Sequence, residues 1–344
     1  MKAAILESPK KLIIRRIRRP ACPPGGILVK VSCCAICSSD ARLVVKGHQG
    51  LVYPRIPGHE FAGAVCESRS NSFFVGDRVQ IYPGLSCGKC SACLRGDSRR
   101  CISLKTLGFS EDGGFAEYLA ISETSIISGV VNLIPENVSD SQAALTEPLA
   151  SCLNAQDKVR AGRGDTVLII GGGPLGLLHS RLARRRGAAK IIIADMEDNR
   201  IKLSRELGQA DRVVDVSLER LPQIISDETG GKGVSVLLLA SNSTPIVNLL
   251  PLLADGGRLS LFSSINKESS FEKFDVNQIH YRELEVSGAF GSTAAQNTSA
   301  LNLIAQGFPV EDLITKRLGI NDIMEGIEYT GARKGLRAMI YFNQ

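Results

Sequence analysis

The sequence contains no tryptophan, and phenylalanine and tyrosine bring the aromatic fraction of its 344 residues to only 5%. A deep pocket walled by aromatic rings for a large apolar ligand is therefore not expected. Long apolar runs are missing too, since none approaches the roughly 20 residues that span a bilayer. The first residues, MKAAILESPKKL, lack the apolar stretch of a secretory signal. These absences predict a cytoplasmic globular protein without a membrane partner.

Acidic residues are outnumbered, because 41 Lys and Arg against 35 Asp and Glu give a net charge of +6. Part of the excess lies in two arginine clusters: Arg15, Arg16, Arg18 and Arg19, and Arg181, Arg184, Arg185 and Arg186. Such clusters can contact nucleic acid, but they are more often solvated faces. We therefore expect no nucleic-acid partner.

Cysteine, in contrast, is plentiful, with ten residues in a chain that shows no export signal. This combination favours metal ligands over disulfides. Four of the cysteines form the pattern C-x2-C-x2-C-x7-C: Cys87, Cys90, Cys93 and Cys101. Four thiolates at this spacing can hold one tetrahedral zinc ion, and an iron–sulfur cluster is the competing interpretation. A single set without a following proline favours structural zinc, with no position open for chemistry.

The stretch from 164 to 195 has the pattern of a dinucleotide-binding unit. The strand Thr166–Ile170 precedes three glycines with G-x-G-x-x-G spacing. These glycines are Gly171, Gly173 and Gly176. They allow a tight turn, close approach of a pyrophosphate, and close packing of strand and helix. Pro174 and Leu175 complete the loop, and a second buried strand, Ile191–Ala194, ends on Asp195.

Asp195 predicts which dinucleotide binds. It stands 19 positions after Gly176, where a carboxylate can accept hydrogen bonds from the ribose hydroxyls of NAD. The same charge would repel the 2′-phosphate of NADP, although Arg200 lies close enough in sequence to offset this effect. We therefore predict NAD(H) as the cofactor, bound with the phosphates at the helix N-terminus.

The remaining pattern divides the chain into two fold classes. Residues 1 to about 140 read as mainly β, with strands at Ala3–Leu6, Ile27–Val31, Phe61–Cys66 and Arg78–Tyr82. Further strands follow the dinucleotide unit: Arg212–Asp215, Val234–Ala240, Arg258–Phe262, Glu283–Ser287, Leu313–Leu318 and Arg337–Phe342. Helices are expected near 197–207, 218–228, 245–254 and 293–306. Alternating strands and helices from about residue 140 to 290 predict a doubly wound parallel sheet.

A second set of metal-ligand residue types is spread along the chain. Cys37 lies in CSSD, His59 and Glu60 lie in PGHEFAG, and Glu147 lies in TEPLA. One thiolate, one imidazole and one carboxylate would leave a position on zinc open for water or substrate. Each residue also has an ordinary explanation as a packed thiol, a turn histidine or a surface acid. Spacing alone does not bring them together.

These motifs resemble the zinc-containing medium-chain alcohol and polyol dehydrogenases, in the sorbitol and threonine dehydrogenase-like branch. The matching segments cover nearly the full length: CSSD (37–40), GHEFAG (58–63), GDRV (76–79), the four-cysteine loop, GGFAEY (113–118), EPLA (147–150) and GGGPLG (171–176). The resemblance implies a GroES-like mainly-β catalytic domain plus a Rossmann coenzyme domain. The catalytic domain would comprise residues 1–139, the NAD-binding domain residues 140–290, and residues 291–344 would return to the catalytic domain.

The resemblance also implies roles for single residues. Cys37 and His59 would ligate a catalytic zinc, and either Glu60 or Glu147 would complete the set. With the four-cysteine site, this makes two Zn²⁺ per chain. Ser39 matches the hydroxyl that relays the substrate proton. Asp40 matches the carboxylate that orients the zinc-bound histidine.

The activity that follows is NAD-linked oxidation of a secondary alcohol to a ketone, on a small polyol or its phosphate. L-Threonine and simple alcohols are the alternative substrates, and a homotetramer or homodimer is the expected assembly. The competing functions are a zinc-free reductase, a zinc-ribbon nucleic-acid module and a non-catalytic NAD sensor. Hydroxyl-rich substrates need polar partners, and four candidates lie in suitable segments: Arg42, His48, Tyr53 and Asn297.

Overall fold

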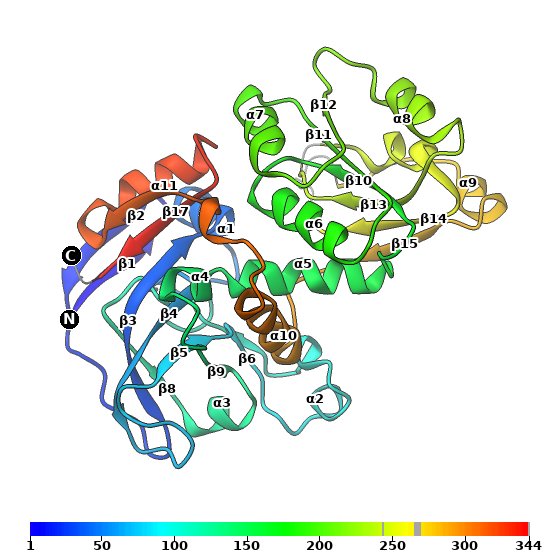
Figure 1. Ribbon diagram of the computed structural model, residues 1–344. Coiled ribbons are helices and arrows are strands. Elements are labelled where there is room, and N and C mark those ends of the chain that lie inside the picture. Colours follow the sequence, from blue (N-terminus) through cyan, green and yellow to red (C-terminus); the bar gives the residue numbers. More distant parts are fainter. Residues whose placement is uncertain (243, 265–269, 343–344) are drawn as a thin grey trace. The chain divides into compact units, whose positions relative to one another are not determined.

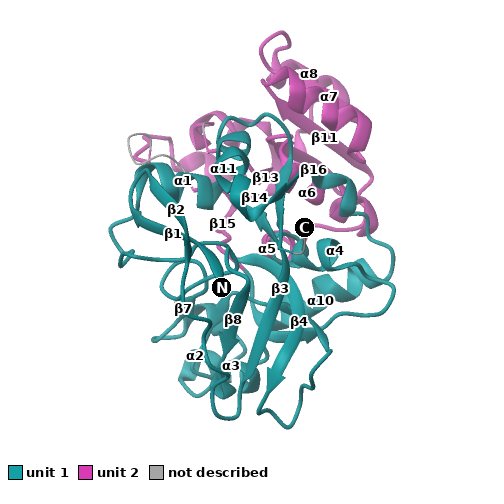
Figure 2. Cartoon of the chain, turned by 90° about the vertical axis from the view of Figure 1, so that its left-hand side faces the viewer, with its two compact units in different colours: residues 1–150, 292–344 teal, residues 151–291 magenta. Residues whose placement is uncertain are grey.

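The computed structural model describes residues 1–242, 244–264 and 270–342. The chain divides into two compact units, drawn in different colours in Figure 2. One unit comprises residues 1–150 and 292–344, and the other comprises residues 151–291. Both chain ends therefore belong to the first unit. The functional domain limits after residues 139 and 290 stay a prediction.

A seven-stranded sheet forms the frame of the first unit, with the order β16-β17-β3-β4-β5-β9 and with β8 paired to β3. Its strands are β3 (Ile27–Ile36), β4 (Glu60–Ser68), β5 (Arg78–Ile81), β8 (Tyr118–Ile121), β9 (Val131–Leu133), β16 (Ile314–Gly319) and β17 (Arg337–Tyr341). Two further pairs join β1 (Lys2–Ser8) to β2 (Lys11–Arg16), and β6 (Gly84–Leu85) to β7 (Lys105–Thr106). The C-terminal segment thus contributes β16 and β17 to a sheet that β3 began.

The helices of the first unit are mostly short. They are α1 (Ser38–Lys46), α2 (Ser91–Leu94), α3 (Glu123–Ile127), α4 (Asp140–Ala144), α10 (Ala294–Ala305) and α11 (Ile323–Gly331), with 3₁₀ turns at 98–100, 311–313 and 320–322. Helix α11 packs against α1, β16 and β17. Helix α5 (Thr146–Lys158) begins in the first unit and continues into the second. Within the described ranges, no helix is both long enough and apolar enough to cross a membrane.

The second unit is a six-stranded sheet in which every pair is parallel, in the order β12-β11-β10-β13-β14-β15. Its strands are β10 (Thr166–Ile170), β11 (Lys190–Asp195), β12 (Arg212–Asp215), β13 (Val234–Leu239), β14 (Leu253–Leu261) and β15 (Glu285–Gly288). Its other helices are α6 (Pro174–Arg185), α7 (Asp198–Leu207), α8 (Leu221–Thr229) and α9 (Asn277–Tyr281), as Figure 1 shows. The predicted doubly wound sheet is confirmed. Its order reverses beside β10, where such sheets bind ligands.

The helix expected near 245–254 is wrong. The structure has two 3₁₀ turns instead, at 246–248 and 250–252, and β14 already begins at Leu253. Pro245 precedes the first turn and Pro251 lies within the second. Because proline lacks an N–H and clashes with the preceding turn, the segment cannot continue as an α-helix. Its apolar residues pack on the sheet from these turns instead.

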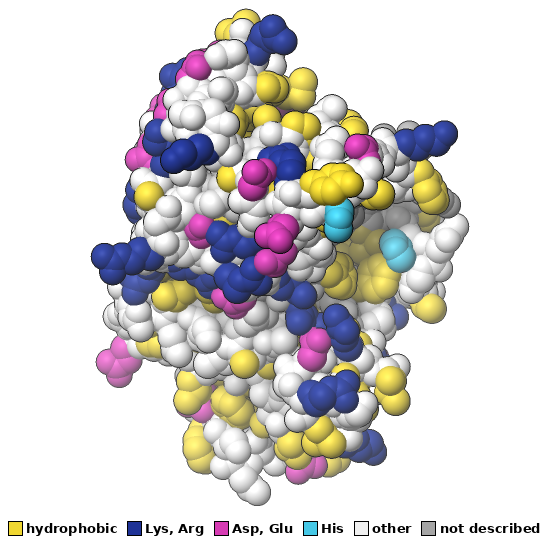
Figure 3. All heavy atoms as spheres, turned by 90° about the vertical axis from the view of Figure 1, so that its right-hand side faces the viewer, with side chains coloured by type: hydrophobic (Ala, Val, Ile, Leu, Met, Phe, Trp, Pro, Cys, Tyr) yellow, Lys and Arg dark blue, Asp and Glu magenta, His cyan; other side chains and the backbone are white. Residues whose placement is uncertain are grey.

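One member of the second arginine cluster, Arg181, is not part of the solvated face that we expected. Arg181 is only 2% exposed, and its Nε and Nη2 donate to the carbonyl oxygen of Leu207 at 3.2 and 2.9 Å. A positive charge at the last residue of α7 also stabilises the helix dipole. Arg184 pairs with Asp211 at 2.7 Å. On the face drawn in Figure 3, Lys and Arg side chains lie among Asp and Glu side chains.

His179 is a titratable side chain sealed inside the second unit. It lies on α6 and is fully buried. The amide Nε2 of Gln156 donates to the His179 carbonyl oxygen at 2.9 Å and lies 3.3 Å from the ring Nδ1. The ring of Phe262 packs against the imidazole with centroids 4.7 Å apart. Burial lowers the pKa of His179 to about 3, and the charge of Arg186 adds to the effect.

This pKa predicts an acid-labile contribution to stability. The folded pKa lies below the ordinary value of about 6.5, so the unfolded chain binds a proton that the folded chain excludes. The contribution is complete above about pH 6.5 and is lost as the pH falls. Between about pH 7 and pH 5, wild-type protein should lose about 2 kcal/mol more unfolding free energy than His179→Asn, whose amide oxygen can replace Nδ1 as an acceptor. Urea unfolding followed by circular dichroism measures both. Equal losses in the two proteins would contradict the expectation.

Candidate metal centres and dinucleotide loop

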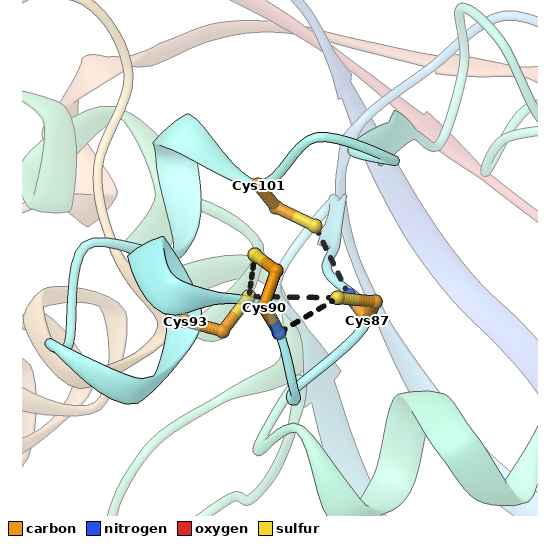
Figure 4. Close-up of side chains that lie close together, drawn as sticks. All are labelled: Cys87, Cys90, Cys93 and Cys101. Carbon is orange, nitrogen blue, oxygen red and sulfur yellow. Dashed lines mark hydrogen bonds between the residues drawn. The ribbon is translucent and has the colours of Figure 1, made fainter.

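The four cysteines of the C-x2-C-x2-C-x7-C pattern converge in the first unit (Figure 4). Their Sγ atoms all lie within 4.8 Å of one another. Two of the separations are 3.5 Å, between Cys90 and Cys93, and 4.0 Å, between Cys87 and Cys93. Tetrahedral ligation at a Zn–S distance of about 2.3 Å puts sulfurs about 3.8 Å apart. The donor set and its spacing therefore fit a tetrahedral zinc ion.

Backbone amides support this site. The N–H of Cys90 donates to the sulfur of Cys87 at 3.4 Å, and the N–H of Cys87 donates to that of Cys101 at 3.3 Å. Backbone N–H groups of Lys89 and Cys90 lower the pKa of the Cys87 thiol to about 6. A thiolate is the form that binds metal. The backbone of the loop thus favours negative sulfur at Cys87, whereas burial raises the pKa of Cys93 to about 11.

Strand register brings the second set of residues together. Ala35 of β3 lies opposite Glu60 of β4. Because the two strands are antiparallel, Cys37 just after β3 and His59 just before β4 lie at the same edge of the sheet. On the other side of β3, Ala338 lies opposite Ile36, which places Arg337 beside Cys37. Residues far apart in sequence therefore meet at one edge. The Sγ of Cys37, a ring nitrogen of His59 and a carboxylate oxygen of Glu60 lie within 4.8 Å of one another.

Asp40 ties Cys37 and His59 into a fixed geometry. One of its oxygens lies 3.2 Å from His59 Nδ1, and the other accepts the N–H of Cys37 at 2.9 Å. The second bond caps α1, whose first residue follows Cys37. A histidine whose Nδ1 is held by a carboxylate presents Nε2 to a metal. Asp40 thus holds the orientation that a ligating histidine needs.

Electrostatics favour a thiolate at Cys37. Burial alone would raise the pKa of Cys37, but the charges of Arg337 and His59 lower it well below its usual range. Burial alone would lower the pKa of His59, but Asp40 and Cys37 raise it well above its usual range. A half-buried anionic sulfur beside an imidazole is a donor pair that suits zinc.

Arg337 is the residue that the sequence did not reveal. It is 3% exposed on β17, and its Nη2 donates to Oε1 of Glu60 at 2.8 Å. Glu60 is fully buried, and its Oε2 has no hydrogen-bond partner among the described residues. An unpartnered buried carboxylate oxygen next to a thiolate and an imidazole fits a place for a cation. The only sequence signal is a lone arginine in an apolar strand, RAMIY.

The other two predicted catalytic residues are Glu147 and Ser39. Glu147 is half-buried in the first turn of α5 and does not belong to the cluster of Cys37, His59 and Glu60. Its charge still acts on Glu60 and Arg337. Ser39 is exposed in the first turn of α1. The structure therefore brings Glu60, rather than Glu147, together with the thiol and the imidazole.

The glycine loop has the geometry that its sequence predicts. Gly171 has φ of 110°, which favours glycine, and a Cβ on Gly176 would lie 1.8 Å from the Gly171 oxygen. Gly173 is the N-cap of α6, with Pro174 as the first helical residue and Leu175 after it. The free N–H groups of this turn and the helix dipole form an anion site. The loop therefore fits a pyrophosphate.

Asp195 holds this loop from the end of β11. Its Oδ2 accepts the N–H of Gly172 at 2.6 Å, and its Oδ1 accepts the N–H groups of Met196 and Glu197 at 2.7 and 3.0 Å. The Nη1 of Arg200 lies 4.0 Å from Oδ2. The guanidinium also lies beside Gly173, where a Cβ would come within 3.3 Å of it. The acid and the arginine thus meet at the glycine loop.

Comparisons with known proteins agree with this arrangement. The family profile "Alcohol dehydrogenase GroES-like domain" matches residues 23–133, and "Zinc-binding dehydrogenase" matches residues 174–306. A D-arabitol-phosphate dehydrogenase from Enterococcus avium is 30% identical over 334 residues, covering 94% of this chain and 92% of its own. An L-threonine 3-dehydrogenase from Rhizobium rhizogenes is 29% identical over 339 residues, covering 95% and 94%.

Solved structures show the same likeness. A zinc-binding dehydrogenase from Sinorhizobium meliloti bound to NADP has a TM-score of 0.89 at 28% identity, covering 99% of this chain and 98% of its own. A short chain alcohol dehydrogenase from E. coli complexed with NADH has a TM-score of 0.90 at 26% identity, covering 99% of both chains. The predicted GroES-like and Rossmann fold class is thereby confirmed. With two zinc-ligand clusters and a dinucleotide loop, the chain belongs to the zinc-containing medium-chain dehydrogenase family.

Proposed function

We propose that the protein is a zinc-dependent, NAD-linked dehydrogenase that oxidises a secondary alcohol of a small polyol, or of its phosphate, to a ketone. The observation that carries this proposal is the convergence of Cys37, His59 and Glu60 around an unpartnered carboxylate oxygen. We propose two zinc ions per chain, one held by the four cysteines and one at Cys37 and His59. Glu60 is the third ligand that the geometry favours, and Glu147 is the alternative.

Zinc bound there would lower the pKa of the substrate hydroxyl, and NAD would accept the hydride from its carbon. The chain's own residues supply position and proton transfer. Asp40 keeps the imidazole of His59 turned, and Arg337 holds one oxygen of Glu60. The exposed hydroxyl of Ser39, in the first turn of α1, can pass the alcohol proton to solvent. Loss of this proton and one hydride converts a secondary alcohol into a ketone.

NAD preference is part of the proposal and rests on Asp195. The carboxylate is only 8% exposed and is held by backbone N–H groups at the loop that would carry the phosphates. A 2′-phosphate placed near it would meet like charge. Arg200 weakens this argument, since its Nη1 lies 4.0 Å from Asp195 Oδ2. One solved relative holds NADH and another holds NADP.

L-Threonine is the second candidate substrate, because threonine 3-dehydrogenases are among the curated relatives. Its amino and carboxyl groups would need charged partners near the zinc site. The arabitol-phosphate relative favours a polyol. Assembly as a homotetramer or homodimer is proposed from the family resemblance alone.

The activity is tested by a screen for NADH and NADPH formation. Sorbitol, xylitol, galactitol, their phosphates, inositols, L-threonine and aliphatic alcohols are offered to the protein with each cofactor. We expect the highest kcat/KM for a polyol or polyol phosphate with NAD. Highest efficiency on a long primary alcohol, or with NADP, would contradict the corresponding part of the proposal. Cofactor binding without turnover of any alcohol would instead indicate a sensor.

The two metal sites should respond differently to loss of one ligand. Cys90→Ser should lower solubility or folded yield, because metal binding and folding of the lobe are coupled. Cys37→Ser should remain folded and bind NAD, yet hold one zinc fewer and lose most activity. Metal analysis, circular dichroism and NAD titration measure these outcomes, with Cys22→Ser as a control outside both clusters. Activity at the wild-type level in both the Cys90 and the Cys37 variant would refute the assignments.

The ion pair between Arg337 and Glu60 should behave as a coupled unit. Arg337→Gln leaves a buried carboxylate without its counter-ion, which costs about 3–5 kcal/mol. The double variant Glu60→Gln/Arg337→Gln removes both charges and should recover most of this loss. Urea unfolding by circular dichroism suits a chain without tryptophan. If the double variant is as unstable as the sum of the single variants, the two residues are not coupled.

A further inference from the structure

The four polar residues that the sequence suggests as substrate contacts differ in exposure and in hydrogen-bond partners. Asn297 is fully buried, and its Nδ2 donates to Gln80 Oε1 at 2.6 Å. The hydroxyl of Tyr53 is buried and directed at Gly47, where a Cβ would come within 2.7 Å of it. Arg42 is exposed on α1, away from the helix face that Leu43 and Val44 bury. His48 differs from these three in combining an exposed ring with a fixed tautomer.

A backbone bond sets the tautomer of His48. The N–H of Gly50 donates to its Nδ1 at 3.0 Å, so Nδ1 is the acceptor and the neutral ring carries its proton on Nε2. The residue itself is exposed. The side chain therefore offers one directed N–H donor to a molecule outside the protein.

Phe109 fixes the position of this donor. Its ring meets the His48 ring edge to face, with centroids 4.8 Å apart and an angle of 76°. Phe109 is half-buried, so part of its ring is also available to a ligand. Edge-to-face pairs of this kind hold both rings in place. Together the two residues offer an apolar ring beside a hydrogen-bond donor.

Close backbone packing holds the loop that carries Phe109 against the loop that carries His59. Gly108, the residue before Phe109, has φ of 79°, and a Cβ there would lie 2.6 Å from the oxygen of Gly58. Gly58 immediately precedes His59. The N–H of Gly114 donates to the Gly58 oxygen at 2.8 Å, which ties the two loops together. No side chain at residue 108 fits between the two backbones, so Gly108 stays against Gly58, and Phe109 and His59 are the residues that follow them. The ring contact with Phe109 ties His48 to the same loop.

We infer that His48 and Phe109 bind the part of a polyol chain that extends away from the zinc site, and so determine specificity for longer polyols. This inference rests on the proposed function. A polyol has C–H groups that can lie on the phenylalanine ring and hydroxyl oxygens that can accept from His48 Nε2. A site that hydrogen-bonds a substrate hydroxyl discriminates against substrates that lack it. Short diols, which end near the zinc site, should not sense either residue.

The test compares xylitol with 2,3-butanediol in the full-length zinc-loaded enzyme with NAD. His48→Phe keeps an aromatic ring against Phe109 but removes the donor, and it should raise KM for xylitol about tenfold with little change in kcat. KM for 2,3-butanediol should stay unchanged. His48→Gln, which restores an N–H donor, should recover most of the loss. Gln49→Ala, an exposed neighbour on the same turn, is the matched control and should resemble wild type.

The other possible results of this comparison overturn either the inference alone or the proposed function as well. An unchanged KM for xylitol in His48→Phe, or an equal rise for both substrates, overturns the inference and leaves the proposed activity standing. Oxidation of 2,3-butanediol but of no polyol by wild-type enzyme also overturns it. Oxidation of no polyol, polyol phosphate or other alcohol of the screen by wild-type enzyme removes the proposed function as well. Circular dichroism of each variant, with turnover of 2,3-butanediol, establishes that the His48 variants are folded.

Discussion

A buried ion pair between Arg337 and Glu60 sits where three strands of the first unit end, and the geometry of the proposed catalytic site depends on it. Both side chains are almost fully removed from water. Burial raises the pKa of Glu60 well above its usual range and Arg337 opposes that rise, so Glu60 needs the arginine to carry its charge. The pair can form only if β17 returns to lie beside β3, because β17 carries the arginine and β4 the glutamate. The ion pair beside the metal-ligand cluster therefore depends on the return of the C-terminal segment.

The same arrangement explains how the chain can hold the sulfur of Cys37 as a thiolate despite its partial burial. Cys37 would be a protonated thiol if burial acted alone, but the guanidinium of Arg337 and the imidazole of His59 counter it. Asp40 in turn holds both the backbone of Cys37 and the ring of His59. Each member thus has a neighbour that fixes its charge or its direction, which is the condition for a pre-formed metal site.

Local features were predictable from the sequence because their causes are local. The four-cysteine spacing led to a compact cluster, and the glycine spacing led to a strand, a tight turn and a helix. In both, the residues that matter lie within one short stretch, and the demands of the backbone limit the residue types. The convergence of Cys37 with His59 and Glu60 depended on family resemblance, since spacing alone does not bring them together.

Features that depend on pairing between distant segments were not predictable. Nothing near Arg337 in sequence indicates that it meets Glu60, 277 positions away. The burial of Arg181 likewise depends on where α7 ends. The helix expected near 245–254 followed the apolar pattern and gave too little weight to Pro245 and Pro251, although proline acts locally. Arg337 and Arg181 thus depend on tertiary contacts, whereas the error near 245–254 came from underweighting a local rule.

The most direct test of the account is a crystal structure of the zinc-loaded protein with anomalous diffraction measured on both sides of the zinc absorption edge. The account predicts two zinc peaks per chain. One should lie among the sulfurs of the four-cysteine cluster, and the other should lie between Cys37 Sγ, His59 Nε2 and a carboxylate oxygen of Glu60 or Glu147. A zinc peak among the four cysteines, with none at Cys37 and His59 in protein that oxidises alcohols, would contradict it.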